Sequence, residues 1–204
     1  MPTKNDTVTR TCMESCLGRF DPTRSGLRVC CGPGTMLREL ADSGLEMVDC
    51  YRSDAAEFLR NGDLVTAFAA INYAHAWIGC FCDLGLFEAD TGKELYETLS
   101  ASDDGESSRI DDQKMAKYLD ITTRARKKLD LAPPARSFDR RLAFKLLDRS
   151  DLYFRTAVDY RKENDYVRAF AAVNYAHAWL DAGARIGLFD VGGDDVLFTL
   201  YERP

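Results

Sequence analysis

A long internal repeat constrains the fold of this 204-residue chain more than any other feature. The segment AFAAINYAHAW at Ala67–Trp77 returns half a chain later as AFAAVNYAHAW at Ala169–Trp179, with a single conservative difference. The match continues in register outside these segments, since Tyr51 corresponds to Tyr153. Internal similarity at a fixed period marks a repeated folding unit. The chain is therefore predicted to be a tandem duplication.

The duplication predicts two units, residues 1–99 and 109–204, joined by residues 100–108. Each unit has about 100 residues, enough to close a modest core of its own. The joining segment SASDDGESS at Ser100–Ser108 is polar, acidic and poor in apolar residues, which is typical of a linker.

Charge and hydropathy exclude some classes of function. The formal net charge is -6 and the isoelectric point is about 5.0, so nucleic acid is not an expected partner. The first half carries 9 Lys and Arg against 15 Asp and Glu, and holds all the excess acid. The sequence contains no uninterrupted apolar stretch of membrane-spanning length, and its first ten residues lack the apolar core of a signal peptide. We expect a cytoplasmic protein with no membrane contact.

The cysteines do not suggest a metal or disulfide framework. Seven thiols, an odd number, all lie in the first unit and include no CxxC pair, which suits a reducing compartment. We expect no metal and no cofactor. Three of them align with Leu or Ala of the second unit and are predicted to be small core residues: Cys50, Cys80 and Cys82.

Apolar residues at three- and four-residue steps predict helices almost throughout the chain. Two such stripes of the second unit are Met115, Leu119, Thr122, Ala125 and Leu129, then Ala143, Leu146, Leu147, Ser150, Phe154 and Ala157. The expected N-caps are Thr35, Asp63, Ser137 and Asp165, and the expected left-handed C-cap residues are Gly85 and Gly187.

These helices predict an all-α fold of two tandem antiparallel three-helix bundles, with no strand required. The repeated helix is apolar on nearly every side, so two partner helices cannot cover it. We therefore expect Ala67–Trp77 and Ala169–Trp179 to meet near a pseudo-two-fold axis, as a pseudo-dimer within one chain. Two short tails, Glu94–Leu99 and Val196–Tyr201, fit either a helical turn or an extended segment.

The stretch NDYVRAFAAVNYAHAWLDAGARIGLFDV, within Tyr118–Val191, resembles the archaeal domain-of-unknown-function 357 family. Similar proteins end their last helix with a YAHxWLDAGxRLGLFDV-like signature, which the second unit matches at nearly every position. The first unit matches more loosely, because Asp181, Gly183 and Arg185 are replaced by Gly79, Phe81 and Asp83. The resemblance implies an archaeal source and a small helical bundle, and brings no catalytic residues.

A polar group on the repeated helix is the candidate site. It comprises Asn174, Tyr175, His177 and Asp181, with Asn72, Tyr73 and His75 in the first unit. A carboxylate that orients an imidazole can begin acid–base chemistry or a metal site. Alternatively, these side chains satisfy one another or the backbone inside a packed helix. Gly79 stands in place of the aspartate in the first unit, so the complete site is not duplicated and the structural interpretation is favoured.

The sequence leaves two functions open. Absent catalytic motifs and Ala-rich packing helices predict a non-catalytic adaptor or scaffold that contacts an unknown protein partner. The alternative is an RNA-directed enzyme or RNA-binding protein that uses the polar group of the second unit and its nearby basic residues. Those residues are Arg124, Arg126, Lys127, Lys128, Arg136, Arg140, Arg141 and Lys145.

Overall fold

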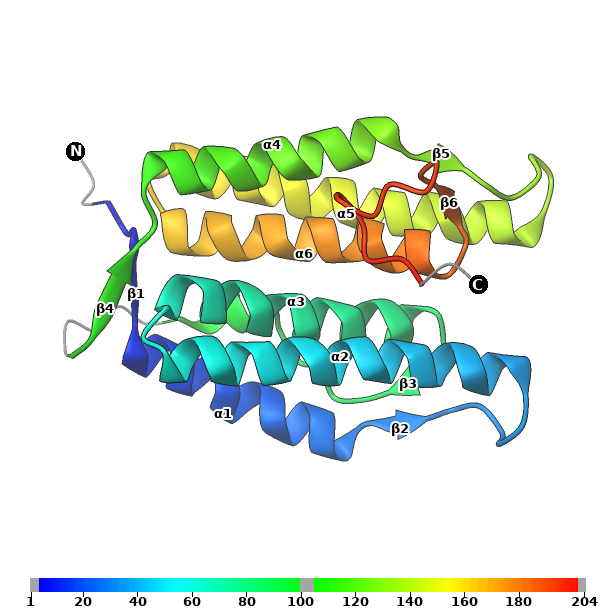
Figure 1. Cartoon of the computed structure of the whole chain (residues 1–204), viewed down its shortest axis with the longest axis horizontal. Helices are drawn as coiled ribbons and strands as arrows, with labels where there is room; N and C mark the ends of the chain where they lie inside the picture. Colours follow the sequence, from blue (N-terminus) through cyan, green and yellow to red (C-terminus); the bar gives the residue numbers. More distant parts are fainter. Residues whose placement is uncertain (1–3, 100–104, 202–204) are drawn as a thin grey trace.

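The computed structural model describes residues 4–99 and 105–201, and over these the chain is mostly helical. Six α-helices fall within this part of the chain, three in each half (Figure 1). They are α1 Arg10–Gly26, α2 Met36–Arg60, α3 Leu64–Asp83, α4 Asp112–Lys128, α5 Phe138–Lys162 and α6 Tyr166–Arg185.

The expectation of no strand is wrong in detail. Short antiparallel pairs join segments that enter and leave the helices. The pairs are β1 Thr7–Thr9 with β4 Ser107–Arg109, β2 Arg28–Val29 with β3 Phe87–Glu88, and β5 Asp130–Leu131 with β6 Phe189–Asp190. Two extended segments that lie side by side form backbone hydrogen bonds, because leaving N–H and C=O groups unpaired costs free energy. Strands of two or three residues are too short to show side-chain alternation, so the sequence could not reveal them.

Part of the expected linker takes part in this pairing. Ser107 and Ser108 lie in β4, with Ser108 opposite Val8 and Arg109 opposite Thr7. Residues 100–104 of the expected linker lie outside the described residues. Where it is described, the joining segment is therefore tied to the N-terminal strand of the first unit.

The core is centred on α3 and α6, which pack against each other (Figure 1). Helices α1 and α2 pack on α3, and α4 and α5 pack on α6. Nearly every residue of α3 and α6 is buried, as their apolar circumference predicts. Helix α3 is long and apolar enough, by length and composition alone, to cross a bilayer, but 83% of that stretch is buried inside the protein.

The expected helix ends are confirmed. The side chains of Thr35, Ser137, Asp63 and Asp165 each accept a hydrogen bond from the backbone N–H three residues later. After α3 the chain turns through Gly85 at φ 73°, and the Leu86 N–H reaches the Phe81 carbonyl at 3.0 Å. This bond closes the helix end that the left-handed glycine makes possible.

The two tails differ from each other. The first forms the 3-10 turn η1 Leu95–Thr98, whereas residues 195–197 of the second form only a hydrogen-bonded turn. Each tail contacts the other unit: Tyr153 of α5 donates to Glu94 at 2.8 Å, and Tyr51 of α2 lies 3.2 Å from the hydroxyl of Thr199. The tails therefore place polar groups at the α3–α6 interface.

Candidate functional site

The two asparagines of the candidate group have a structural role. Asn72 donates its side-chain amide to the Phe68 carbonyl at 2.8 Å, and Asn174 donates to the Phe170 carbonyl at 2.7 Å. Both bonds run back to the preceding turn of the same helix. Neither amide hydrogen-bonds to the neighbouring histidine. The asparagines are therefore not part of one polar site with the His and Asp residues, as the sequence had suggested.

His75 and Tyr175 meet across the α3–α6 interface. The Tyr175 hydroxyl lies 2.7 Å from His75 Nδ1 and accepts the Leu95 N–H at 3.2 Å. The His75 ring also makes a hydrogen bond to the Thr91 backbone, which uses the ring proton of the neutral imidazole, so Nδ1 is the nitrogen that accepts from the Tyr175 hydroxyl. Burial, aided by the charge of Arg19, lowers the pKa of His75 to about 4. His75 is a neutral, fully engaged core side chain.

The equivalent pair, Tyr73 and His177, is arranged differently. Tyr73 donates to Asp181 Oδ2 at 3.1 Å, and its ring centroid is 6.2 Å from that of His177. His177 Nε2 lies 2.9 Å from the Leu197 carbonyl and Nδ1 lies 3.5 Å from the Thr122 hydroxyl. Because a carbonyl can only accept, Nε2 donates to Leu197, and the lone pair of the neutral ring lies on Nδ1, which faces the Thr122 hydroxyl.

The Asp181 carboxylate holds the second tail. Its Oδ1 accepts the Thr199 N–H at 2.5 Å, while its other oxygen binds Tyr73. Burial raises the pKa of Asp181 and lowers that of His177. The pair lies close enough for each charge to oppose these shifts, as in an acid–base dyad, but each partner is committed to the tail. The geometry therefore fits a structural lock better than a reacting centre.

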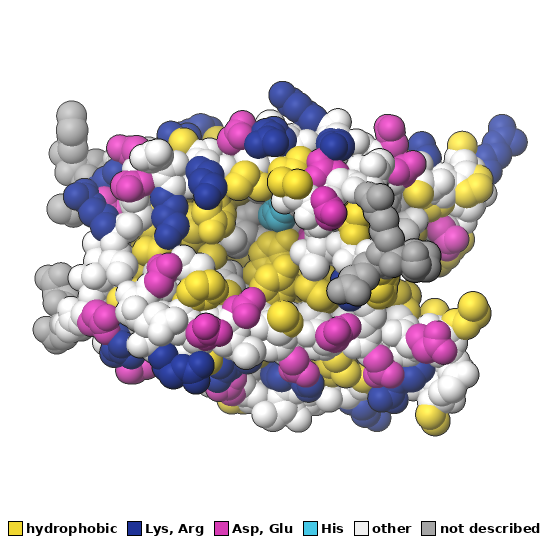
Figure 2. All heavy atoms as spheres, viewed as in Figure 1, with side chains coloured by type: hydrophobic (Ala, Val, Ile, Leu, Met, Phe, Trp, Pro, Cys, Tyr) yellow, Lys and Arg dark blue, Asp and Glu magenta, His cyan; other side chains and the backbone are white. Residues whose placement is uncertain are grey.

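Two cavities open beside this pair. One, of about 400 Å³, is lined by Tyr51, Tyr73, His177 and residues 195–200. The other, of about 180 Å³, also uses Tyr51 and Tyr73 and extends to Thr66 and Asn174. Figure 2 shows the hollow on this face, with a histidine at its floor and apolar side chains around it. Three residues of the predicted polar group therefore line these cavities: Tyr73, His177 and Asn174.

Sequence reasoning missed the residues that hold the tails. Arg19 of α1 donates to the carbonyls of Lys93 at 2.7 Å and Leu95 at 2.9 Å. Arg168 of α6 reaches the carbonyls of Tyr96 and Leu99 at 3.3 and 3.2 Å. Neither arginine has an equivalent, because Ile121 and Thr66 occupy the matching positions. That asymmetry in the repeat was the available signal.

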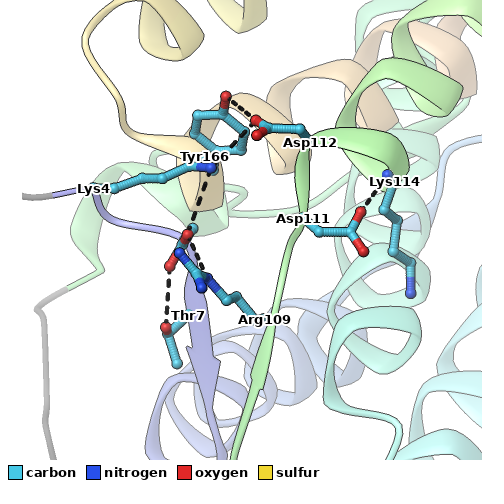
Figure 3. Close-up of polar contacts among 8 residues, drawn as sticks. Lys4, Thr7, Arg109, Asp111, Asp112, Lys114 and Tyr166 are labelled. Carbon is cyan, nitrogen blue, oxygen red and sulfur yellow. Dashed lines mark hydrogen bonds and ion pairs between the residues drawn. The ribbon is translucent and has the colours of Figure 1, made fainter.

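A second missed cluster joins the N-terminal segment to α4 and α6 (Figure 3). Lys4 pairs with Asp112 at 3.2 Å and lies 3.9 Å from the centre of the Tyr166 ring. Tyr166 donates to Asp112 at 2.5 Å, and Arg109 binds the buried Asp6 at 2.7 Å. These contacts connect the N-terminal segment of the first unit to the second unit.

The cysteines lie apart from these sites. Cys80 is buried and Cys82 half-buried, but Cys50 is exposed, so its expected core position is wrong. Its equivalent Leu152 is also exposed, so alignment with an apolar residue did not indicate a buried position. Within residues 4–99 and 105–201, no three His, Cys, Asp or Glu side chains gather in a group able to hold a metal ion.

The chain belongs to the family described as Protein of unknown function (DUF357), whose sequence pattern matches it twice, at residues 24–87 and 117–189. The two matches confirm the resemblance and the tandem duplication. No curated protein and no solved structure matches the chain.

Proposed function

We propose that this protein is a non-catalytic scaffold of the archaeal cytoplasm, whose two units together bind an amphipathic helix of a partner protein. One observation carries the proposal: an apolar groove of about 440 Å³ that is lined by residues of both units. Its matched pairs are Leu40 with Leu142, Leu84 with Ile186, and Leu86 with Leu188.

The rim of the groove supports the same interpretation. Met36 and Phe138, the first residues of α2 and α5, are 87% and 68% exposed. Helices α2 and α5 begin at the same end of the molecule (Figure 1), and Figure 2 shows apolar side chains on both sides of an indentation at that end. Large apolar side chains gathered around a groove mark an interaction surface in a soluble protein.

Charge next to the groove suggests the chemistry of the partner. The groove shares Leu84 and Leu142 with a neighbouring cavity of about 540 Å³ on α5. That cavity is lined by Lys145 and Arg155, which form no ion pair with any described residue, by Asp148, and by the Arg149–Asp83 ion pair, which leaves a net charge of +1. A helix with an apolar face and acidic flanking residues fits this combination.

Purification from native lysate tests the proposal. A protein that elutes with the wild type should be lost with Leu37→Glu, because Leu37 lines the groove and is 58% exposed, and the new carboxylate would lie against apolar surface and repel an acidic partner. Val196→Glu is the matched control, since Val196 is 86% exposed but lies outside the groove. A partner that still elutes with Leu37→Glu would refute the groove.

The RNA-directed alternative draws less support from the geometry. Arg126 pairs with Asp151 at 2.9 Å and Lys128 with Asp194 at 2.5 Å, while Arg168 is occupied by the first tail. These cations are largely neutralised within the protein. Nucleic acid that elutes with the wild type in the same purification would favour this alternative.

We further propose that residues 1–99 and 109–204 are two three-helix bundles related by a pseudo-two-fold axis. The strand register supports this, since Thr7 lies opposite Arg109, the residue half a chain later. The equivalent residues Tyr153 and Tyr51 each contact the tail of the other unit, through Glu94 and Thr199, which supports it too. Residues 109–204 expressed alone should dimerise through α6; a stable, strictly monomeric fragment at high concentration would overturn this proposal.

A further inference from the structure

The second tail lies along α2 over about two helical turns. The Thr199 hydroxyl is 3.2 Å from that of Tyr51, and the Tyr201 hydroxyl donates at 2.6 Å to Ser43, nearer the start of α2. The Tyr201 ring also packs on the guanidinium of Arg185, which lies 4.1 Å from the ring centre. The end of this tail therefore occupies the space between α2 and the end of α6.

The first tail leaves the equivalent stretch of α5 uncovered. Its Glu94 meets Tyr153, the equivalent of Tyr51, but the chain then turns as η1, and Arg168 near the start of α6 binds the Leu99 carbonyl. From there towards the start of α5 lies the cavity of about 540 Å³, and no described residue of the first tail lines it.

The repeat identifies this cavity as the counterpart of the space that the second tail fills. Lys145 of the cavity is equivalent to Ser43, and Asp83 is equivalent to Arg185. Asp83 binds Arg149 of α5 at 3.2 Å, and Arg185 binds Ser43 of α2 at 3.1 Å. The same helix ends therefore meet in both units, but a tail covers this contact only on the α2 side.

The charges around the cavity indicate what it accepts. Lys145, Arg149 and Arg155 line it, and Lys145 and Arg155 are exposed and form no ion pair with any described residue. Their equivalents in α2 carry no charge: Ser43, Met47 and Ser53. Because Asp83 and Asp148 oppose only two of the three cations, the cavity favours an anionic occupant.

Part of the cavity wall is apolar. The buried side chains of Leu146 and Trp179 line it together with Leu152, which is 44% exposed. A small inorganic anion would leave this surface uncovered. An extended peptide places successive side chains on opposite sides, so an apolar residue can pack on this wall while the next residue reaches the basic side chains.

We propose that this cavity binds an extended acidic segment of the partner protein, in the manner in which the second tail lies on α2. An apolar side chain of the segment packs on Trp179 and Leu152. A carboxylate binds Lys145, at the position where the Tyr201 hydroxyl meets Ser43. The inference rests on the proposed function, since the cavity and the groove share two lining leucines and the segment continues from the helix in the groove.

Calorimetric titration of the whole protein at low ionic strength tests the site with two synthetic peptides too short to form a helix. The acidic peptide is acetyl-ELFEL-amide, and its neutral control is acetyl-QLFQL-amide. We expect saturable one-to-one binding of the acidic peptide and about tenfold weaker binding of the control. No saturable binding of the acidic peptide up to about 5 mM, or equal affinity for both peptides, would overturn the proposal.

Three variants assign the binding to this place. Lys145→Glu should weaken the acidic peptide about tenfold, whereas Lys127→Glu, the same change at an exposed position of α4 outside the cavity, should leave the affinity unchanged. Leu37→Glu alters the groove alone and should bind the peptide normally, so failure of the groove and failure of this site are distinguishable. Wild-type affinity in Lys145→Glu, or loss of binding in Leu37→Glu, would show that the peptide binds elsewhere and would refute the site.

Discussion

The two tyrosine–histidine pairs at the α3–α6 interface derive from one repeated sequence but have different surroundings. Around Tyr175 and His75 the first tail forms η1, although Leu95 and Tyr96 are buried just as their equivalents Leu197 and Phe198 are. Around Tyr73 and His177 the equivalent tail leaves a cavity of about 400 Å³. The same two side chains therefore form a closed core contact in one place and line an open site in the other.

The difference lies in what anchors each tail. Arginines from α1 and α6 hold the first tail by its carbonyl groups, and Arg19 and Arg168 have no counterparts in the repeat. A carboxylate, Asp181, holds the second tail by the Thr199 N–H, and its own counterpart is Gly79. A duplicated core can thus diverge in function through a few unpaired substitutions at its edge, without any change to the core motif.

Acid should distinguish the two histidines, with the largest effect at His75. Its pKa falls from 6.5 to about 4 on folding, so the unfolded chain binds the extra proton first. Stability should therefore decrease as pH falls from about 6.5 towards about 4, with up to about 3 kcal/mol from His75 alone.

His75→Gln, which cannot titrate, isolates this contribution. Urea unfolding at several pH values should show that acid lowers the stability of the variant less than that of the wild type. Asp181 contributes in the opposite direction, but equally in both proteins, so it cancels in the difference between them. Parallel pH profiles would mean that His75 is not buried neutral.

Helices α3 and α6 pack differently against the second helix of their units, and adding a single methyl group should reveal the difference as a change in stability. A Cβ on Gly44 would overlap the ring of Phe81, whereas in the second unit the equivalent residues are Leu146 and Gly183, with the large and small residues exchanged. Gly44→Ala should destabilise the protein by about 2 kcal/mol through overpacking.

Gly79→Ala is the matched control, because nothing lies within 4 Å of the added Cβ. It should gain up to about 1 kcal/mol from helix propensity. Denaturant midpoints measure both, and equal effects of the two changes would contradict the described packing.

Removing the arginine that holds the first tail should loosen that tail without loosening the second. Arg19→Met keeps an unbranched apolar stem but removes the guanidinium and its bonds to the Lys93 and Leu95 carbonyls, which should lower the free energy of unfolding by about 1–2 kcal/mol. Hydrogen exchange should accelerate at η1 and remain unchanged at residues 195–200. Acceleration at both tails would indicate that they open together.

The smallest expected difference concerns the two tyrosines that reach the opposite tails. Tyr153→Phe removes a 2.8 Å bond to the Glu94 carboxylate, while Tyr51→Phe removes a 3.2 Å contact with the Thr199 hydroxyl. We expect losses of about 1.5 and 0.5 kcal/mol, since bonds to charged groups are stronger. Thermal unfolding checks the order, and the reverse order would show the second tail to be held more tightly.

The sequence by itself determined the repeat, the family, the helices and their caps. These features depend on residues close together in the chain: the periodicity that fills α3 and α6, and side chains such as Ser137 that bind the backbone three residues away. Local rules of this kind hold whatever the rest of the chain does. Even the structural role of the duplicated asparagines follows from bonds within one helical turn.

Only the tertiary structure decided which polar residues meet. The partners of the predicted group come from distant segments: Asp181 binds Tyr73 from the other unit, and His177 binds the Leu197 carbonyl in the tail. No spacing in the sequence encodes these contacts, because they depend on how two helix faces and two tails fit together. A cavity is the space that such packing leaves unfilled, and it exists here because Thr66 is small where Arg168 is large.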